Sequence, residues 1–236
     1  ELGDRNDFNL ACEYGQKVAD ELSAAGFNLN FAPVLDLDTN PRNPIIGDRS
    51  LGADPERVGE LGAAFALGMQ SRGVIAVGKH FPGHGDTDHD SHFRLPEVSA
   101  SAETLTGREL VPFKRAVSRG IAGIMISHVL YPAWDRENPA TTSPRIINIL
   151  KGDLNFSGVI FSDDFEMEAL DQNNLGEKAV QAVQAGIDQI LVCKTAEKQV
   201  EVFEALVKAV EKGVISQARL ESAGRNITAL KRQYIV

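Results

Sequence analysis

The sequence predicts an α/β fold with a parallel sheet, and three observations support this prediction. Short apolar runs alternate along the chain with segments whose apolar residues recur at helical spacing. The runs are apolar throughout, which is typical of strands covered on both faces. Polar candidates for function follow the carboxyl ends of the runs, at Asp36, Lys79, His80, His128, Asp163 and Lys194. A (β/α)8 barrel and an open doubly wound sheet both place a site there.

The first predicted unit is a helix followed by a strand. Apolar residues recur at helical spacing after Phe8, at Ala11, Tyr14, Val18 and Leu22. Gly26 follows at the position of a left-handed C-terminal cap. Residues 27–38 then read as a strand that delivers carboxylates to its carboxyl end, and a proline-rich loop covers residues 40–49.

The second unit repeats this arrangement. Asp54 and Pro55 supply an N-cap and a first-turn proline for a helix. Its apolar face consists of Val58, Leu61, Phe65 and Met69. Gly73 closes the helix, and residues 74–80 form the next strand.

The later units follow the same alternation. Thr106 to Glu109 is a possible capping box for a helix that carries Leu110, Phe113 and Val117 and ends at Gly120. Ser143 and Pro144 begin a short helix. We expect strands at 121–128, 159–164 and 189–194, and further helices at 177–185, 197–212 and 217–234. No G-x-G-x-x-G follows a strand, so a dinucleotide-binding open sheet loses its main support.

Composition limits the classes of partner. The 236 residues are 43% hydrophobic, which suits one α/β domain over residues 1–236. The net charge is −9 without a clustered basic patch, which argues against nucleic acid or an anionic membrane surface as partner. No apolar run is long enough to span a bilayer. Cys12 and Cys193 are too few for a disulfide framework.

One loop concentrates the polar chemistry. Residues 79–96 hold four of the five histidines together with aspartates, glycines and prolines, directly after an apolar run. A strand that leads into such a loop is typical of a binding or catalytic site. Physical reasoning on the residues alone reaches an acidic α/β enzyme with a His/Asp-rich loop.

Three motifs carry a resemblance to a known family. They are KHFPGHGDT at 79–87 with DSHFRLP at 90–96, FSDD at 161–164, and IGDRS at 46–50. Together they resemble glycoside hydrolase family 3, in its β-N-acetylglucosaminidase branch. The resemblance implies a (β/α)8 barrel, of which about five β/α units are recognisable. We therefore expect the N-terminal units to be missing, including the family's Asp-Gln-Glu-Gly-Gly-like segment, whose aspartate binds the sugar.

The resemblance implies a retaining exo-glycosidase that removes terminal N-acetyl-β-D-glucosamine from peptidoglycan fragments, without metal or organic cofactor. Asp163 matches the family's nucleophile. Asp90 and His92 match an acid/base dyad in which the carboxylate orients the imidazole. Arg49, Lys79 and His80 match sugar contacts.

His128 is a further substrate-binding candidate, which we expect beside the pocket and behind the direct contacts. Each of these residues also has a structural interpretation: Asp163 as a turn cap, Lys79 in a salt bridge, Arg49 holding its own loop and His80 as a hydrogen-bonded core residue.

Three alternatives stay open. The histidines and aspartates of the loop could instead bind zinc in a metal-dependent hydrolase. The chain could be a β-glucosidase-type member of the same family. It could also be a non-catalytic sugar-binding barrel, since missing strands would expose sheet edges. We expect a cytoplasmic location, with a secreted or lipoprotein form as the alternative because the natural N-terminus is not visible.

Overall fold

Five parallel strands form one sheet at the centre of the molecule. The computed structural model describes residues 2–43, 45–87 and 95–235. The strands are Leu29–Asn30 (β1), Ile75–Phe81 (β2), Gly123–Ile126 (β3), Val159–Asp164 (β4) and Gln189–Leu191 (β5). Their spatial order is β1-β2-β3-β4-β5, so every strand pairs with its neighbour in sequence. This order is that of a (β/α)8 barrel and not of a doubly wound sheet, and the described residues supply five strands of it.

The strands alternate with helices as the sequence predicts. The α-helices are Leu2–Arg5 (α1), Phe8–Ala24 (α2), Pro55–Ser71 (α3), Ala102–Thr104 (α4), Leu110–Ser118 (α5), Pro144–Asn148 (α6), Leu175–Ala185 (α7), Ala196–Glu211 (α8) and Gln217–Tyr234 (α9). Short 3-10 turns occupy Gly47–Arg49 (η1) and Ala140–Thr142 (η3). Single π-helical stretches occupy Leu105–Glu109 (η2) and Ile149–Asp153 (η4).

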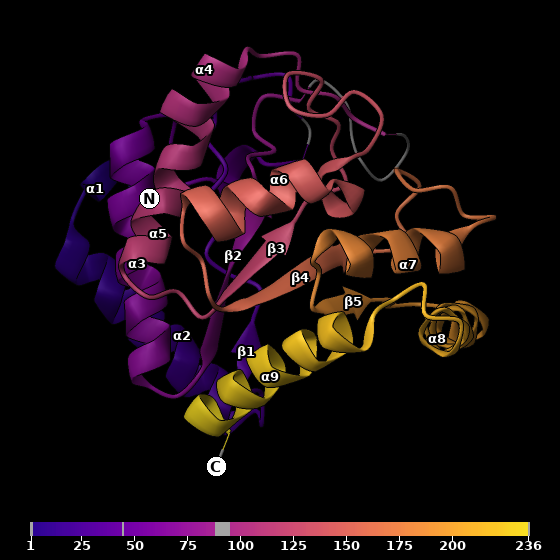
Figure 1. Ribbon diagram of the computed structural model, residues 1–236. Coiled ribbons are helices and arrows are strands. Elements are labelled where there is room, and N and C mark those ends of the chain that lie inside the picture. The colour runs from indigo at the N-terminus through magenta and orange to yellow at the C-terminus, as the bar shows by residue number, and fades with distance from the viewer. Residues whose placement is uncertain (1, 44, 88–94, 236) are drawn as a thin grey trace.

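The main core lies between the sheet and the helices on one of its faces. Helices α3, α5, α6 and α7 surround the strands on this side (Figure 1). Buried apolar residues from the strands and these helices form one continuous cluster. On the other face, a smaller cluster that includes Val77, Met125 and Phe161 packs against Ile227 and Leu230 of α9. Because both faces are covered, the strands read as apolar throughout.

Two predicted helix starts illustrate how local signals work in this chain. The carboxylate of Asp54 accepts a hydrogen bond from Arg57 N at 2.8 Å, and Pro55 opens α3, as expected. The predicted capping box at Thr106 is wrong. The helix begins earlier, because Ser101 Oγ accepts from Thr104 N at 3.1 Å, and the chain winds on through η2 into α5. Thr106 lies inside this helix and donates its hydroxyl to Ala102 O.

The predicted strand at 27–38 is regular only at its start. Pro33 has no backbone N–H and therefore interrupts the ladder after β1. Pairing with β2 nevertheless continues, since Lys79 N donates to Pro33 O at 3.0 Å and Leu35 N donates to Lys79 O at 2.6 Å. This register brings Asp36 beside His80.

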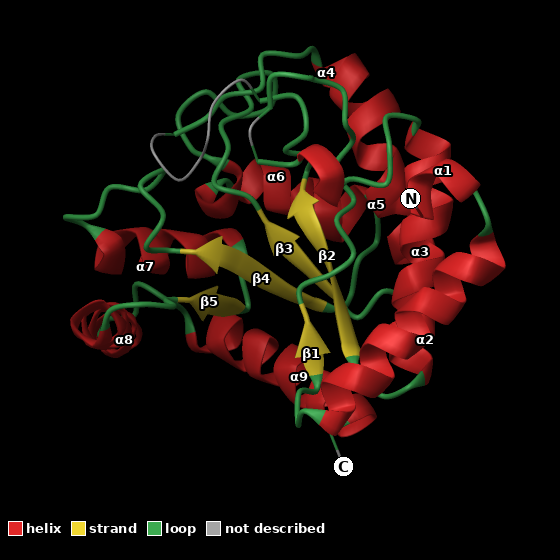
Figure 2. Ribbon diagram, turned by 180° about the vertical axis from the view of Figure 1, so that it is seen from behind, coloured by secondary structure: helices red, strands yellow, loops and turns green. Residues whose placement is uncertain are grey.

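The carboxyl ends of the strands point to one end of the molecule. Figure 2 shows the arrowheads of β2 and β3 directed toward the same group of loops. The loops after β1, β2 and β4 therefore lie where a barrel places its functional residues. Among residues 2–43, 45–87 and 95–235, no helix has both the length and the apolar run that crossing a bilayer requires.

Candidate active site

A small pocket lies at the carboxyl ends of β2 and β4. Its volume is about 160 Å³, and its lining residues are Ile45, Arg49, Lys79, His80, His84, Asp163 and Met167. Four residues predicted from the sequence therefore meet here: Arg49, Lys79, His80 and Asp163. They come from three segments of the chain, namely η1, the end of β2 and the end of β4.

Among the described residues of the lining, Asp163 is the only carboxylate, and the pocket stabilises its charged form. Burial by itself would raise the pKa of Asp163. The charge interactions with His80 and His128 and a hydrogen bond from Asp164 N, at 2.8 Å to Oδ1, outweigh it, so the pKa lies below its ordinary value. The carboxylate is therefore ionised at neutral pH, as a nucleophile must be.

Lys79 and Arg49 place two cationic side chains beside this carboxylate. Burial and the charge of Arg49 lower the pKa of Lys79, while Asp163 and Asp36 oppose the shift. Arg49 donates from Nη1 to Ile45 O at 3.2 Å, which ties its side chain to its own loop. The pocket thus presents several charge-assisted donors, as a ligand rich in hydroxyl groups requires.

His80 is held from behind by a fully buried carboxylate. Asp36 is 0% exposed, and its Oδ2 lies 2.7 Å from His80 Nδ1. Oδ1 of the same residue accepts from His84 N at 2.7 Å. Sequence reasoning noticed Asp36 only as a strand-end residue, because its partners lie 44 and 48 positions away along the chain.

His84 stabilises the loop that follows β2. Its Nδ1 contacts Thr87 Oγ1 at 3.0 Å, and Thr87 in turn donates to His84 O. Burial and the charge of His80 lower the pKa of His84 to about 4, so its imidazole is neutral at pH 7. The next residue, Gly85, packs its Cα directly against the Leu37 carbonyl, and a Cβ there would overlap that oxygen.

A buried acid supports the same loop from the helix below it. Glu109 is 1% exposed, and a Cβ added to Gly83 would press against its side chain. Arg108 Nε donates to Glu109 Oε1 at 2.6 Å, whereas Oε2 has no hydrogen-bond partner within the described part of the chain. Burial raises the pKa of Glu109 to about 7, against the opposing effect of Arg108.

His128 lies behind the pocket and not in its lining. The side chain is buried, with Nε2 3.1 Å from Asp164 O and Nδ1 2.6 Å from Thr141 Oγ1. Both ring nitrogens are therefore engaged within the protein. Lys194, the other strand-end candidate, is not in the lining.

Asp90 and His92, the expected acid/base dyad, lie outside the described residues, as do His89 and Asp88 of the zinc alternative. Within residues 2–43, 45–87 and 95–235, no group of three or more His, Cys, Asp or Glu side chains is arranged to hold a metal ion. Ile45 and Met167 are lining residues that the sequence did not single out, because isolated apolar residues in loops follow no period.

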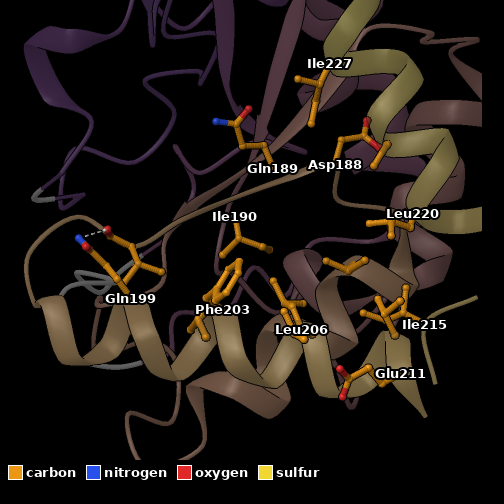
Figure 3. A pocket seen from close by; sticks show the side chains of 16 residues that line it. Asp188, Gln189, Ile190, Gln199, Phe203, Leu206, Glu211, Ile215, Leu220 and Ile227 are labelled. Atoms are coloured by element: carbon orange, nitrogen blue, oxygen red, sulfur yellow. Dashed lines mark hydrogen bonds between the residues drawn. The ribbon is translucent and has the colours of Figure 1, made fainter. Parts of the chain in front are cut away.

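A larger hollow lies elsewhere and has a different chemistry. A groove of about 810 Å³ lies between β5, α8 and α9. Figure 3 shows Ile190, Phe203 and Leu206 directed into it. Its buried acid, Asp188, is occupied by an ion pair with Arg219 at 2.9 Å. We therefore place the candidate active site in the smaller pocket.

Comparisons with known proteins identify the family of the chain. Residues 1–230 match the family model described as the glycosyl hydrolase family 3 N-terminal domain. A β-hexosaminidase of Nitrosomonas eutropha is 39% identical over 225 residues, covering 94% of this chain and 64% of the relative. A β-hexosaminidase of Methylococcus capsulatus is 42% identical over 193 residues, covering 81% of this chain and 58% of the relative. The chain thus spans about three fifths of these curated relatives.

Solved structures show the same similarity. A glycoside hydrolase family 3 β-N-acetylglucosaminidase of a Paenibacillus species superposes with a TM-score of 0.96 at 44% identity. The match covers 99% of this chain and 45% of that protein. The barrel-type α/β fold expected from the motifs is therefore confirmed.

Proposed function

This chain belongs to the glycosyl hydrolase family 3 N-terminal domain family, and on that premise we propose that it carries the catalytic centre of a retaining exo-β-N-acetylglucosaminidase. We further propose that residues 1–236 act as one domain. The observation that carries the proposal is the meeting of one ionised carboxylate, Asp163, with Arg49, Lys79 and His80 in a single pocket. Asp163 is the proposed nucleophile.

The size of the pocket favours action on the end of a sugar chain. Its volume of about 160 Å³ is well below the roughly 300–1,000 Å³ of sites that enclose drug-sized ligands. One sugar ring suits such a space better than a run of rings. Ile45 and Met167 supply apolar wall, against which the carbon-bearing face of a ring can pack.

The proposed reaction has two steps at the anomeric carbon. Asp163 attacks this carbon while an acid protonates the departing glycosidic oxygen, and a covalent glycosyl-enzyme forms. Water then attacks the same carbon, the former acid accepts its proton, and the bond to Asp163 breaks. Two inversions give net retention. Hydrogen bonds from Lys79, Arg49 and His80 to the sugar hydroxyls hold the ring for both steps.

We propose His92 as the acid and base of these steps, oriented by Asp90. An imidazole has an ordinary pKa of about 6.5, so it can donate and accept a proton near neutral pH. A carboxylate that accepts its Nδ1–H would fix the tautomer and stabilise the imidazolium. The support for this pair is its position in the motif at residues 90–96.

The choice of N-acetylglucosamine as substrate rests on the relatives, which are named β-hexosaminidase or β-N-acetylglucosaminidase. We extend the proposal to peptidoglycan-derived fragments, which carry this sugar at their ends. We propose that the reaction needs neither a metal nor an organic cofactor.

The test is hydrolysis of aryl N-acetyl-β-glucosaminide and aryl β-glucoside by the purified chain, with and without a chelator. We expect chelator-resistant turnover that prefers the N-acetyl substrate. A slow fluorosugar substrate should add one sugar to the protein, and mass spectrometry of peptides should locate it on Asp163. Preference for the glucoside would indicate a β-glucosidase, and turnover without labelling of Asp163 would contradict the proposed nucleophile.

A further inference from the structure

Asp36 makes an unusual set of contacts for a buried carboxylate. Its side chain is 0% exposed, and the described donors to it all come from the segment that carries the pocket histidines. Oδ2 lies 2.7 Å from His80 Nδ1, and His80 N lies 3.1 Å from both carboxylate oxygens. His84 N donates to Oδ1 at 2.7 Å.

These contacts settle the protonation of the pair. Burial would raise the pKa of Asp36, but the charge of His80 and its hydrogen bond, with further help from His84, lower it below its ordinary value. An ionised carboxylate only accepts hydrogen bonds, so Nδ1 of His80 must carry a proton. Within the described residues Nε2 of His80 has no hydrogen-bond partner, and the ring lines the pocket. Nε2 is thus the atom available to a ligand.

His80 in turn acts on the proposed nucleophile. Its charge is the largest influence that lowers the pKa of Asp163, ahead of His128 and Lys79. The other charged or titratable groups around these two residues are Arg49, His84, Asp36 and Asp164. A change at Asp36 should therefore reach Asp163 through His80, although Asp36 does not line the pocket.

We propose that Asp36 is a positioning residue for the glycosidase reaction, which fixes the tautomer of His80 and the backbone between His80 and His84. This inference rests on the proposed function for its kinetic consequences. Its structural part, the Nδ1-protonated state of His80, holds whether or not the chain turns over substrate. The arrangement matches the general pattern in which a carboxylate orients a working imidazole.

The isosteric variant Asp36→Asn separates positioning from simple packing. An amide that replaces Oδ2 with an NH2 group donates to Nδ1 of His80 and so moves the ring proton to Nε2. We expect kcat/KM to fall by roughly 10²–10³-fold. The acid limb of the pH profile of kcat/KM should move to higher pH, because a change at His80 weakens the interaction that lowers the pKa of Asp163.

Asp188→Asn is the matched control. Asp188 is also a buried carboxylate that accepts from a backbone N–H, Ile160 N at 3.2 Å, and pairs with a cation, Arg219, at 2.9 Å. It lies in the apolar groove and away from the pocket lining. Both variants should lower the melting temperature, but Asp188→Asn should leave the shape of the pH profile unchanged.

A double-mutant cycle and NMR complete the experiment. In a His80→Gln background, Asp36→Asn should change kcat/KM by less than about threefold. The reason is that each substitution removes the same interaction, the one between Asp36 and His80. Nitrogen-15 NMR of the wild-type chain should show His80 protonated at Nδ1, and this signal should be lost in Asp36→Asn. An Asp36→Asn profile parallel to wild type, additive effects in the cycle, or an Nε2-only tautomer of His80 in the wild type would each overturn the proposal.

The NMR measurement also covers two other outcomes. If the wild-type chain has no turnover, the proposed function fails, and the state of His80 alone decides whether Asp36 positions it. If Asp36→Asn does not fold, the tautomer of His80 in the wild-type chain decides in the same way. The two proposals can therefore fail separately.

Discussion

The small pocket at the ends of β2 and β4 and the large groove beside α8 are built from opposite kinds of residue. The pocket, at about 160 Å³, gathers Asp163, Lys79 and Arg49. The groove, at about 810 Å³, is lined mainly by aliphatic residues and Phe203, and its buried acid, Asp188, pairs with Arg219. Charged groups are costly to bury, so they gather where they do chemistry or pair with one another. Volume alone would favour the groove, whereas the chemistry of the lining favours the pocket.

The largest expected effect is at Asp163. Asp163→Ala removes the proposed nucleophile and should lower kcat by roughly 10⁴-fold or more while leaving the chain folded. Asp164→Asn is the control, because Asp164 Oδ1 only accepts from Glu166 N and Cys193 N, and an amide oxygen does the same. It should retain activity within about tenfold. The measurement is hydrolysis of an aryl glycoside. Comparable losses of activity in both variants would contradict a special role of Asp163.

The second effect is selective for the leaving group. His92→Ala should slow cleavage by about 10²–10⁴-fold for alkyl or sugar leaving groups, which need a proton on the departing oxygen. Substrates with an activated aryl leaving group should lose much less. A series of aryl glycosides of graded acidity measures the difference, and equal losses across the series would exclude His92 as the acid.

The third effect is a pH dependence of the free energy of unfolding, caused by Glu109, which packs against the loop after β2. Glu109 has its pKa raised from 4.5 to about 7 by burial. The folded chain therefore binds more protons than the unfolded chain between these values, and the contribution of Glu109 to stability decreases as pH rises from about 4.5 through about 7. Wild type should therefore lose about 1–3 kcal/mol of its free energy of unfolding between pH 5 and pH 8 through Glu109. Glu109→Gln should not show this loss.

Urea denaturation of both proteins at the two pH values tests this expectation. Glu56→Gln is the control, because Glu56 is an exposed acid that also faces an arginine, Arg115, at 3.4 Å. Its pH dependence should match wild type. If Glu109→Gln keeps the wild-type slope, the buried acid does not titrate in this range.

The smallest effect is expected in the groove. Phe203 is 68% exposed, so Phe203→Ser should change the free energy of unfolding by less than about 1 kcal/mol and leave kcat/KM unchanged. Phe113→Ser is the contrast, since Phe113 is buried edge-to-face against Phe81 at 5.2 Å and should cost about 3–5 kcal/mol. Reduced turnover in Phe203→Ser would couple the groove to the pocket.

Most of the fold could be predicted from periodicity and caps. Helix 217–234 begins and ends as predicted, and Asp54 and Pro55 open α3. The start of the helix at residue 102 could not be predicted, because Ser101 and Thr106 are both plausible caps and the choice depends on tertiary packing. The predicted strand at 27–38 is shortened at Pro33, but Leu35 still pairs with Lys79.

The candidate site could also be predicted only in part, because a sequence shows local patterns and not contacts between distant segments. The strand-end rule and the motifs brought Arg49, Lys79, His80 and Asp163 together. The bond between Asp36 and His80 depends on the register of two strands 44 residues apart, which a local pattern does not encode.

The packing of Gly85 against the Leu37 carbonyl bears on attempts to alter which sugars are accepted. Two main chains touch there without a side chain between them, so the loop has no adjustable contact at that point. A library that randomises residue 85 would therefore lose most of its members to misfolding before selection begins. Diversity is better introduced at Ile45 and Met167, whose side chains border the pocket.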